Sequence, residues 1–584
     1  MRRFTCDFET TTDLNDCRVW AYALCEIGNP DNFIYGNKID DLIEWCKEQK
    51  DNVALYFHNL KFDGAFITYY LETHGYSWIP EVKEAEDNTY STLITNMGAW
   101  YSIEIFFKVK GKHRNKVTIY DSLKILNMPA EKIAEGFDLP IRKLELDYTT
   151  YREPGHKLTQ HEIDYIRNDV EIVARALDVL FKQGHTKMTI GSDALAHFKS
   201  MCPDFRNLFP VLELDIDRDI RQSYKGGFTY LNPLYKEKEG GSGWVLDVNS
   251  LYPSILATKP LPVRLPVPFE NKYEYDPQYP LYVQSLSCRF QIKPGKIPSI
   301  QIKSHFAFRP NEYLESSDGK LVNLMLTNPD LELFYEQYDV YDEQWQGGWK
   351  FQSVEGLFAD FIGYWTEQKI KAKKEKNAAQ YQISKIIMNS TYGKFGTNPL
   401  GAKKRPYIAD DGAIHELYLD IEERKPIYVP VASFTTSYAR CKTIRTSQAI
   451  RDWSLKNKGY DAYVYSDTDS IHVSRLNYND FVPLKDIIEI DDYKLGAWKV
   501  ESRYWRSKYL RQKTYCELQP NGKMNVVVAG LPKKLSHLVN FDNFKLGFNT
   551  ADFTDEEVGE KGRKLTYKHV PGGVVLVPTD FSIN

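Results

Sequence analysis

The segment Ala462-Tyr463-Val464-Tyr465-Ser466-Asp467-Thr468-Asp469-Ser470-Ile471-His472-Val473 carries the most information about the fold. Two strand-like halves flank a polar centre, a pattern that predicts a β-hairpin with carboxylates at its turn. An acid at the end of a buried strand is costly unless it is paired or binds a metal ion. Taken alone, Asp467-Thr468-Asp469 fits a simple turn equally well.

A second acid ends an apolar strand far upstream, in Trp244-Val245-Leu246-Asp247-Val248. The chain continues into Asn249-Ser250-Leu251-Tyr252-Pro253, where the proline predicts a turn or the start of a helix. The strand and the hairpin thus offer carboxylates that could share one site.

Between them, a helical stretch from Leu357 to about Tyr392 is interrupted by the basic run 371–376. Lys385, Asn389 and Tyr392 fall at i, i+4 and i+7 and share one helix face. A cation, an amide and an aromatic ring suit a triphosphate, a sugar and a base pair. Lys373, upstream on the same stretch, is a weaker candidate for holding the triphosphate.

The N-terminal part contains another set of acids. Asp7 and Glu9 alternate with apolar residues on a predicted strand, so both carboxylates lie on one face. Their repulsion is commonly offset by a divalent cation. Asp63 follows the predicted strand 53–57, and Tyr165 lies one helical turn before Asp169.

Each of these acids singly is best interpreted as a helix cap or a surface residue. The set in this order instead predicts a two-metal phosphodiester hydrolase. The same Asp-x-Glu spacing at Asp330 and Glu332 is interpreted as solvated helix surface.

Composition narrows the class of protein. The 584 residues are 42% apolar and 26% charged, as in ordinary globular proteins of two to four domains. The eight cysteines include no Cys-x-x-Cys pair, which argues against a zinc site or a disulfide framework. No apolar run reaches membrane-spanning length. A net charge of −4 does not favour nucleic-acid binding, but 40 Tyr and 11 Trp suit base stacking as well as core packing.

The chain divides into recognisable regions. Residues 1–190 alternate strand-like and helix-like patterns, with a helix at 159–183 that Gly184 ends. Residues 256–358 are irregular, with several prolines and short strand-like pieces. Residues 396–430 predict a β-hairpin with its turn at Asp411-Gly412.

These motifs together resemble family B DNA polymerases. Residues 247–253 (DVNSLYP), 385–393 (KIIMNSTYG) and 465–470 (YSDTDS) look like polymerase motifs A, B and C. The N-terminal sets look like the three motifs of the 3′→5′ exonuclease domain. Residues 224–227 (YKGG) resemble the Tyr-x-Gly-Gly linker, and 513–515 (KTY) the Lys-x-Tyr motif. The short length and the two excursions resemble the protein-primed branch typified by phi29-like phage polymerases.

The resemblance implies an α/β multidomain fold. Residues 1–190 would form an RNase-H-like 3′→5′ exonuclease domain, and 191–584 a right-hand polymerase domain with palm, fingers (about 357–395) and a C-terminal thumb. The insertion at about 256–358 would bind a terminal protein. The hairpin at about 396–430 would act in processivity and strand displacement.

The resemblance also implies roles for single residues. The polymerase metals would be held by Asp247, Asp469 and the Val248 carbonyl, with Asp467 as a less certain ligand. The nucleotide would be bound by Tyr252, Lys373, Lys385, Asn389 and Tyr392. The exonuclease metals would be held by Asp7, Glu9, Asp63 and Asp169, assisted by Tyr165 and Lys143. DNA would be contacted by His58, Asn59, Phe62, Ser122, Leu123, Tyr224, Gly226, Gly227, Thr435, Arg440, Lys513 and Tyr515.

Three positions depart from the family pattern. Ala439 stands for the glycine of the Thr-x-x-Gly-Arg element, and Ser466 for a Gly or Cys before the catalytic aspartate. Glu145 stands where the family has an aspartate near Lys143, and its assignment as a metal ligand is left open.

The implied cofactor is Mg²⁺, two ions per active site, with Mn²⁺ as a substitute. Implied partners are template-primer DNA, a displaced single strand, dNTPs and a terminal protein, with the chain acting as a monomer or as a heterodimer with that protein. The implied location is the cytoplasm of an infected bacterial host, without membrane contact. The alternatives are a stand-alone metal-dependent 3′→5′ exonuclease and a non-catalytic DNA-binding replication scaffold.

Overall fold

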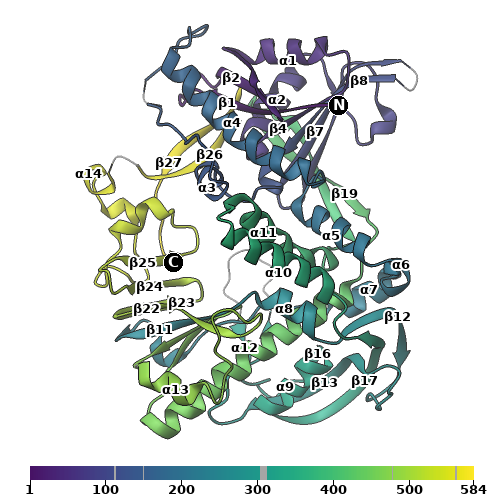
Figure 1. Cartoon of the computed structure of the whole chain (residues 1–584), viewed down its shortest axis with the longest axis vertical. Coiled ribbons are helices and arrows are strands. Elements are labelled where there is room, and N and C mark those ends of the chain that lie inside the picture. The colour runs from purple at the N-terminus through teal and green to yellow at the C-terminus, as the bar shows by residue number, and fades with distance from the viewer. Residues whose placement is uncertain (111–112, 149, 303–311, 477, 560–561) are drawn as a thin grey trace.

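The structure, a computed structural model, describes residues 1–584 except 111–112, 149, 303–311, 477 and 560–561. Figure 1 shows the N-terminal half at the top and the remaining sheets below it. The C-terminal segments run along one side and reach up to the N-terminal half. Within the described residues, no helix combines the length and apolar composition that crossing a membrane requires.

A ten-stranded sheet organises the described part of the N-terminal half, in the order β19-β18-β6-β7-β8-β4-β1-β2-β3 with β5 beside β6. Its strands are β1 (Arg2–Thr10), β2 (Val19–Glu26), β3 (Asn29–Gly36), β4 (Val53–Phe57), β5 (Ser77–Trp78), β6 (Thr89–Thr95), β7 (Trp100–Lys110), β8 (His113–Asp121), β18 (Leu400–Ile408) and β19 (Ile414–Glu423). The accompanying helices are α1 (Ile39–Glu48), α2 (Leu60–Thr73), α3 (Ala130–Gly136) and α4 (Gln160–Lys182). The predicted helix at 159–183 is confirmed: Thr159 and Glu162 form a capping box, and Gly184 follows with φ +86°.

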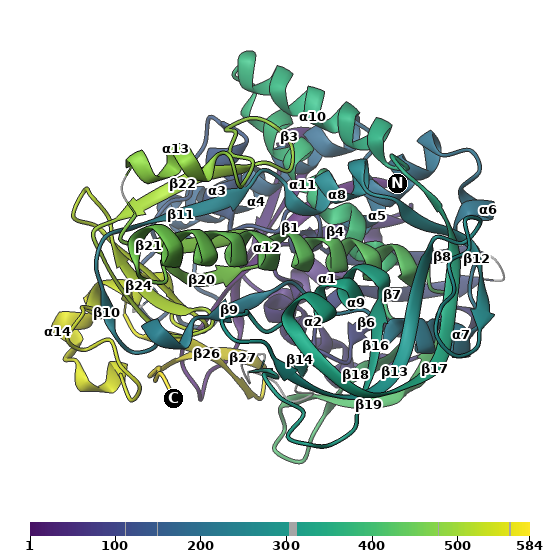
Figure 2. The same cartoon turned by 90° about the horizontal axis from the view of Figure 1, so that it is seen from below.

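A five-stranded sheet, in the order β22-β11-β21-β20-β9, carries the segments for which the resemblance predicts a palm, and it is called the palm below. Its strands are β9 (Thr229–Leu231), β11 (Gly243–Val248), β20 (Tyr463–Asp467), β21 (Ser470–Ser474) and β22 (Trp498–Tyr504). The predicted hairpin is β20–β21, and Pro253 lies in the first turn of α8 (Leu251–Thr258). The 30-residue helix α12 (Val429–Lys458) contacts both β20 and the first insertion, and Figure 2 shows it crossing the molecule between them.

The first insertion is an ordered module, but its main strands are not short. Its sheet has the order β12-β17-β13-β16, formed by β12 (Leu261–Phe269), β13 (Leu281–Ile292), β16 (Val322–Thr327) and the 17-residue β17 (Tyr338–Val354), with α9 (Asn328–Gln337) against it. The pair β14 (Gln301–Ile302) and β15 (Glu312–Tyr313) completes the described part. Register shifts and Gly347-Gly348 interrupt the alternation of β17, which is why the sequence pattern indicates short pieces.

The helical stretch expected at 357–392 forms two helices, α10 (Ala359–Lys374) and α11 (Ala378–Phe395), and the break between them falls at the end of the basic run 371–376. Lys376 has a left-handed backbone (φ +55°), and the Asn377 side chain caps α11. Lys373 and Lys385 therefore do not share a face of one helix. The antiparallel packing of α10 on α11 nevertheless brings both to one cavity.

The C-terminal region forms a small sheet in the order β10-β23-β24-β25 and a separate ribbon. The elements are β10 (Glu239–Gly240), β23 (Arg506–Arg511), β24 (Thr514–Leu518), β25 (Met524–Val528), α14 (Asp555–Val558), β26 (Lys564–Val570) and β27 (Gly573–Thr579); α5 (Ile190–Met201), α6 (Phe205–Leu208), α7 (Leu214–Arg221) and α13 (Phe481–Leu484) complete the main helices. Val570, Val574 and Val575 of the ribbon and Ile414 of β19 enter the N-terminal core. Residues 1–190 therefore do not complete that half alone.

Candidate active sites

The N-terminal acids converge at one end of the central strands. Asp7 and Glu9 lie on β1, Asp63 in the first turn of α2, and Asp169 within α4. Carboxylate oxygens of Asp7, Glu9 and Asp169 all lie within 4.8 Å of one another. Asp63 is buried beside them, and burial together with Asp7 raises its pKa well above the usual range.

The electrostatics of this cluster fit divalent cations. Burial raises the pKa of Asp7 to about 7, and the Asp169 carboxylate adds to the shift. The Oδ1 atoms of Asp63 and Asp169 are buried, and neither has a hydrogen-bond partner among the described residues. Buried, unpartnered carboxylate oxygens are suitable ligands for Mg²⁺, so the donor set fits the implied metal. The Lys143 ammonium donates to Asp169 from the side.

Two tyrosines border the acids. The Tyr165 hydroxyl lies 2.9 Å from that of Tyr148. Burial raises the pKa of Glu9 well above its usual range, and a hydrogen bond from Tyr148 offsets a small part of this increase. Tyr148 was missed because it lies in an irregular segment without periodicity.

Glu145 does not join the cluster: its side chain is exposed, while its carbonyl accepts from His161 at 3.1 Å. Its assignment as a metal ligand is therefore wrong.

The residues expected to hold a frayed 3′ end line the same area. The His58 ring lies 3.0 Å from Ser122 Oγ and 2.8 Å from the Met128 carbonyl. Ser122 is fully buried and donates to the Phe57 carbonyl, so it positions His58 and cannot contact DNA directly. Leu123 is partly exposed, and its backbone N–H donates to Asp121.

Asn59 and Phe62 meet the C-terminal ribbon. Asn59 Nδ2 donates to the Tyr567 hydroxyl at 3.1 Å, and the Phe62 ring lies 6.0 Å from the Tyr567 ring. Both residues are partly exposed. Tyr567 was missed because nothing local predicts that residues about 500 positions apart meet.

The second set of acids lies on the palm. In the sheet register Asp247 on β11 and Asp467 on β20 both lie opposite Ser470 on β21. The Val248 N–H donates to the Asp469 carbonyl at 2.8 Å, which fixes the turn against β11. Burial raises the pKa of Asp247 to about 6, with Asp469 and then Glu501 adding to the shift. The charge of this cluster also suits divalent cations.

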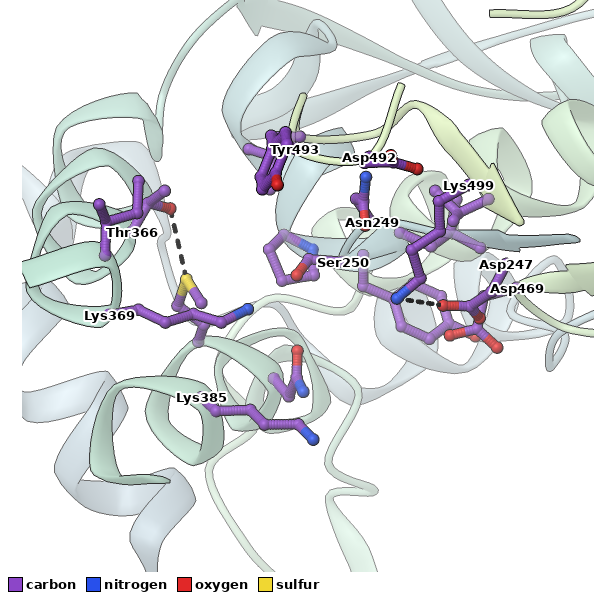
Figure 3. A pocket seen from close by; sticks show the side chains of 18 of the residues that line it. Asp247, Asn249, Ser250, Thr366, Lys369, Lys385, Asp469, Asp492, Tyr493 and Lys499 are labelled. Carbon is purple, nitrogen blue, oxygen red and sulfur yellow. Dashed lines mark hydrogen bonds and ion pairs between the residues drawn. The ribbon is translucent and has the colours of Figure 1, made fainter. Parts of the chain in front are cut away.

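Asp247 and Asp469 open onto a cavity of about 790 Å³ between the palm and α10–α11. The opposite wall carries the expected Lys373, Lys385, Asn389 and Tyr392, together with Lys369. Figure 3 shows Lys369 and Lys385 across the cavity from Asp247 and Asp469. The Tyr252 and Tyr392 rings stack with centroids 4.1 Å apart. Lys369, Lys499 and Tyr493 were missed; only Lys369, one turn before Lys373, left a sequence signal.

The Lys-x-Tyr motif lies beside the palm turn. Lys513 Nζ lies 3.1 Å from both carboxylate oxygens of Asp467, and its backbone N–H donates to Tyr465 Oη at 3.0 Å. Tyr515 stacks on Tyr509 with centroids 5.2 Å apart. The Asp467 carboxylate is thus paired with the Lys513 ammonium at the turn.

The two linker glycines, Gly226 and Gly227, differ in how much space surrounds them. A Cβ on Gly227 would lie 2.4 Å from Thr468 Oγ1, so this position needs glycine where the linker crosses the palm turn. Gly226 has open space around it. The Tyr224 hydroxyl lies against Gly396, where a Cβ would come within 2.5 Å.

Thr435 and Arg440 were both expected to contact DNA, but α12 carries them through the interior of the protein. Thr435 is fully buried and donates to the Val431 carbonyl at 2.7 Å. The Arg440 side chain is 4% exposed, and its guanidinium binds Asp330 and the carbonyls of Lys225 and Gly226. Thr435 therefore cannot contact DNA directly, whereas Arg440 borders a cavity beside the linker and fixes the linker carbonyls. Asp330 is therefore a partly buried partner of Arg440 and not solvated surface, whereas Glu332 is exposed as expected.

Comparison with known proteins gives the class first. Residues 46–483 match the family described as DNA polymerase type B, organellar and viral. The chain therefore belongs to the type B DNA polymerases of this organellar and viral family.

More particular similarities cover the whole chain. It is 45% identical to the DNA polymerase of Bacillus phage M2, over 100% of this chain and 99% of the relative. The orthorhombic structure of phi29 DNA polymerase matches with a TM-score of 0.91 and 41% identity, and its ternary complex with primer-template DNA and incoming nucleotide substrates with 0.90 and 42%; both cover 100% of each chain. The protein is a DNA-directed DNA polymerase similar to those of phi29-like phages, with an N-terminal exonuclease-type domain and a right-hand polymerase domain.

Proposed function

We propose that the palm site adds dNTPs to a primer and that the N-terminal site removes 3′-terminal nucleotides from the same strand. The observation that carries the proposal is the presence of two carboxylate clusters on two separate sheets, of which the palm cluster faces a cavity lined by Lys369, Lys373, Lys385 and Lys499. A nuclease has no triphosphate to hold, so the lysine wall argues against a stand-alone exonuclease. A DNA-binding scaffold needs no buried acids.

In the polymerase reaction the primer 3′-OH attacks the α-phosphorus of a dNTP and pyrophosphate leaves. Asp247 and Asp469 would hold Mg²⁺, with the Val248 carbonyl assisting. When bound, a pair of Mg²⁺ ions supplies activation of the hydroxyl and compensation of the phosphate charge. Lys373 and Lys385 bind the triphosphate from α10 and α11, while Asn389 and the Tyr252–Tyr392 stack border the sugar and the nascent pair.

In the editing reaction His58, Asn59, Phe62 and Leu123 hold the melted 3′ end. Asp7, Glu9, Asp63 and Asp169 would hold the metals that support hydrolysis of the terminal phosphodiester. Tyr165 and Lys143 orient the reacting groups from the rim of the cluster. Lys513 and Tyr515 contact the primer terminus at the palm, next to the Asp467 turn.

One assay tests this division of labour. With a labelled primed template, Mg²⁺ and all four dNTPs, the protein should extend the primer; with Mg²⁺ alone, it should shorten the primer from its 3′ end. Shortening without extension would favour the stand-alone exonuclease, and neither reaction would favour the scaffold.

We further propose protein-primed, strand-displacing replication of a linear phage genome in the host cytoplasm. The first insertion docks a terminal protein whose hydroxyl replaces the primer 3′-OH, and the β18–β19 hairpin acts with the displaced strand. The support is similarity over the whole chain and the ordered form of both insertions. A folded variant with a disrupted first insertion should extend DNA primers normally but fail to attach a nucleotide to the terminal protein; normal attachment would refute this assignment.

A further inference from the structure

Lys499 lies directly opposite the catalytic Asp247 in the pairing of β22 with β11. Its Nζ is 3.3 Å from Asp247 Oδ2, and both side chains are partly exposed at the floor of the polymerase cavity. Directly opposite residues have neighbouring Cβ atoms, so the sheet register fixes the Cβ atom of Lys499 beside that of Asp247 and leaves the flexible stem free to move the ammonium. Figure 3 shows the ammonium reaching the Asp247 carboxylate.

The palm acids account for the position of this ammonium. Asp247 is close enough to Asp469 and Glu501 for their charges to raise its pKa, after burial. A single ammonium beside Asp247 offsets part of this repulsion. A divalent cation at Asp247 and Asp469 would do so more strongly, and it would compete with Lys499 for the same carboxylate.

The wall of the cavity opposite Lys499 carries three further lysines that could bind the same anion. Lys369, Lys373 and Lys385 line that wall, and none of them forms an ion pair with a carboxylate among the described residues. Burial, followed by Lys385, Lys499 and Lys373, lowers the pKa of Lys369. Lysines crowded around one cavity repel one another until a polyanion binds between them.

We propose that Lys499 is a palm-side ligand of the incoming triphosphate, and that its ammonium leaves Asp247 for the phosphate oxygens when a divalent cation binds the palm acids. The inference rests on the proposed nucleotide site. A lysine suits this exchange because its charge sits on a flexible four-carbon stem with rotatable donors. Lys499 thereby binds the nucleotide from the side opposite Lys373 and Lys385.

The first arm of the test measures metal binding without nucleotide. Lys499→Met removes the charge at similar length, and Lys499→Arg retains it. Both are made in an Asp7→Ala, Glu9→Ala background, so that the palm dominates binding of Mn²⁺ followed by electron paramagnetic resonance. Lys499→Met should bind Mn²⁺ about three- to tenfold more tightly, because the competing cation is gone. Lys494→Met is the matched control, since Lys494 is exposed and pairs with Glu489 outside the palm acids.

The second arm measures nucleotide affinity on a dideoxy-terminated primer-template with Mg²⁺. Lys499→Met should raise the Kd of the next correct dNTP about tenfold, whereas Lys499→Arg should stay within a few-fold of wild type. Lys385→Met is the reference for the site itself and should also weaken dNTP binding. Lys494→Met should leave the Kd unchanged.

We expect Lys499→Met to bind Mn²⁺ more tightly and dNTP more weakly than the wild type. If Lys499 only formed a cross-strand ion pair with Asp247, the substitution would cause no loss of dNTP affinity. If the dNTP Kd is unchanged in Lys499→Met but raised in Lys385→Met, the inference about Lys499 is wrong while the proposed nucleotide site stands. Unchanged values in both variants would refute the nucleotide site. Unchanged or weaker Mn²⁺ binding in Lys499→Met would refute the exchange.

Discussion

Tyr252 shows how one side chain can set sugar choice. It lies in the first turn of α8, directly after the motif A strand, and its ring is held against Tyr392 with centroids 4.1 Å apart. In the proposed nucleotide site, a ring fixed at this wall would clash with a 2′-hydroxyl. Tyr252→Val should therefore raise the ratio of rNTP to dNTP incorporation about ten- to a hundredfold. The measurement is single-nucleotide kcat/KM for both sugars; an unchanged ratio would assign the selection to another residue.

The acid cluster makes a prediction about pH. Asp7 has a pKa of about 7 in the folded protein because of burial and Asp169, against about 4 in an unfolded chain. Between these values the folded state binds more protons than the unfolded state, so its free energy of unfolding decreases as pH rises toward about 7. In EDTA, Asp7→Asn should be more stable than wild type by about 1–3 kcal/mol at pH ~8, and the difference should shrink toward pH ~5.

Urea unfolding in EDTA at a series of pH values measures this difference. Saturating Mg²⁺ should reverse the order of stability at pH ~8, because the wild-type carboxylates then gain a ligand. Parallel pH profiles for the two proteins would show that Asp7 does not titrate as described.

At the scale of elements, the β18–β19 hairpin joins the exonuclease sheet. Lys403 and Lys404 pair with Thr95 and Ile94 of β6, and Trp100 Nε1 donates to Glu416 at 2.9 Å. The hairpin leaves α11 and returns to α12, so it connects the fingers and the palm to the N-terminal half. This placement suits an element that contacts DNA between the two halves.

Deleting residues 398–425 should shorten the products on long templates and weaken duplex binding, while single-nucleotide addition survives. It should also lower Tm by several degrees, because buried Ile414 leaves the N-terminal core. Glu416→Gln, which keeps the hairpin, is the control and should leave product length unchanged. A folded deletion variant that still displaces long strands on the original template would contradict the proposed role of the hairpin.

Local pattern was sufficient for the elements that carry the acids. Alternation places Asp7 and Glu9 on one strand face, helical spacing places Tyr165 above Asp169, and the polar turn of residues 467–469 lies at a hairpin. The basic run 371–376 marks an interruption of the helical stretch, but lysines are good helix formers, so the pattern did not indicate that the chain reverses at Lys376 and Asn377. Non-local pairing was also out of reach: the burial of Arg440 depends on Asp330, and the position of Lys499 on the register of β22 with β11.

At the scale of the whole molecule, segments from distant parts of the chain tie the two catalytic halves together. The ribbon β26–β27 contacts α2 beside the exonuclease acids, while β23–β24 of the same C-terminal region carry the Lys513–Tyr515 motif at the palm turn. One C-terminal region therefore lies beside both carboxylate clusters. We nevertheless assign the chemistry of each site to its own carboxylates.

The most direct test of that separation is a reciprocal pair of variants assayed on one labelled primer-template. Asp247→Ala should reduce dNTP incorporation to below a few per cent of wild type while degradation of a single-stranded 3′ end continues at the normal rate. The double variant Asp7→Ala, Glu9→Ala should extend the primer normally and lose degradation of the same 3′ end. Loss of both activities in either folded variant, or retention of the targeted activity, would contradict two independent active sites in this chain.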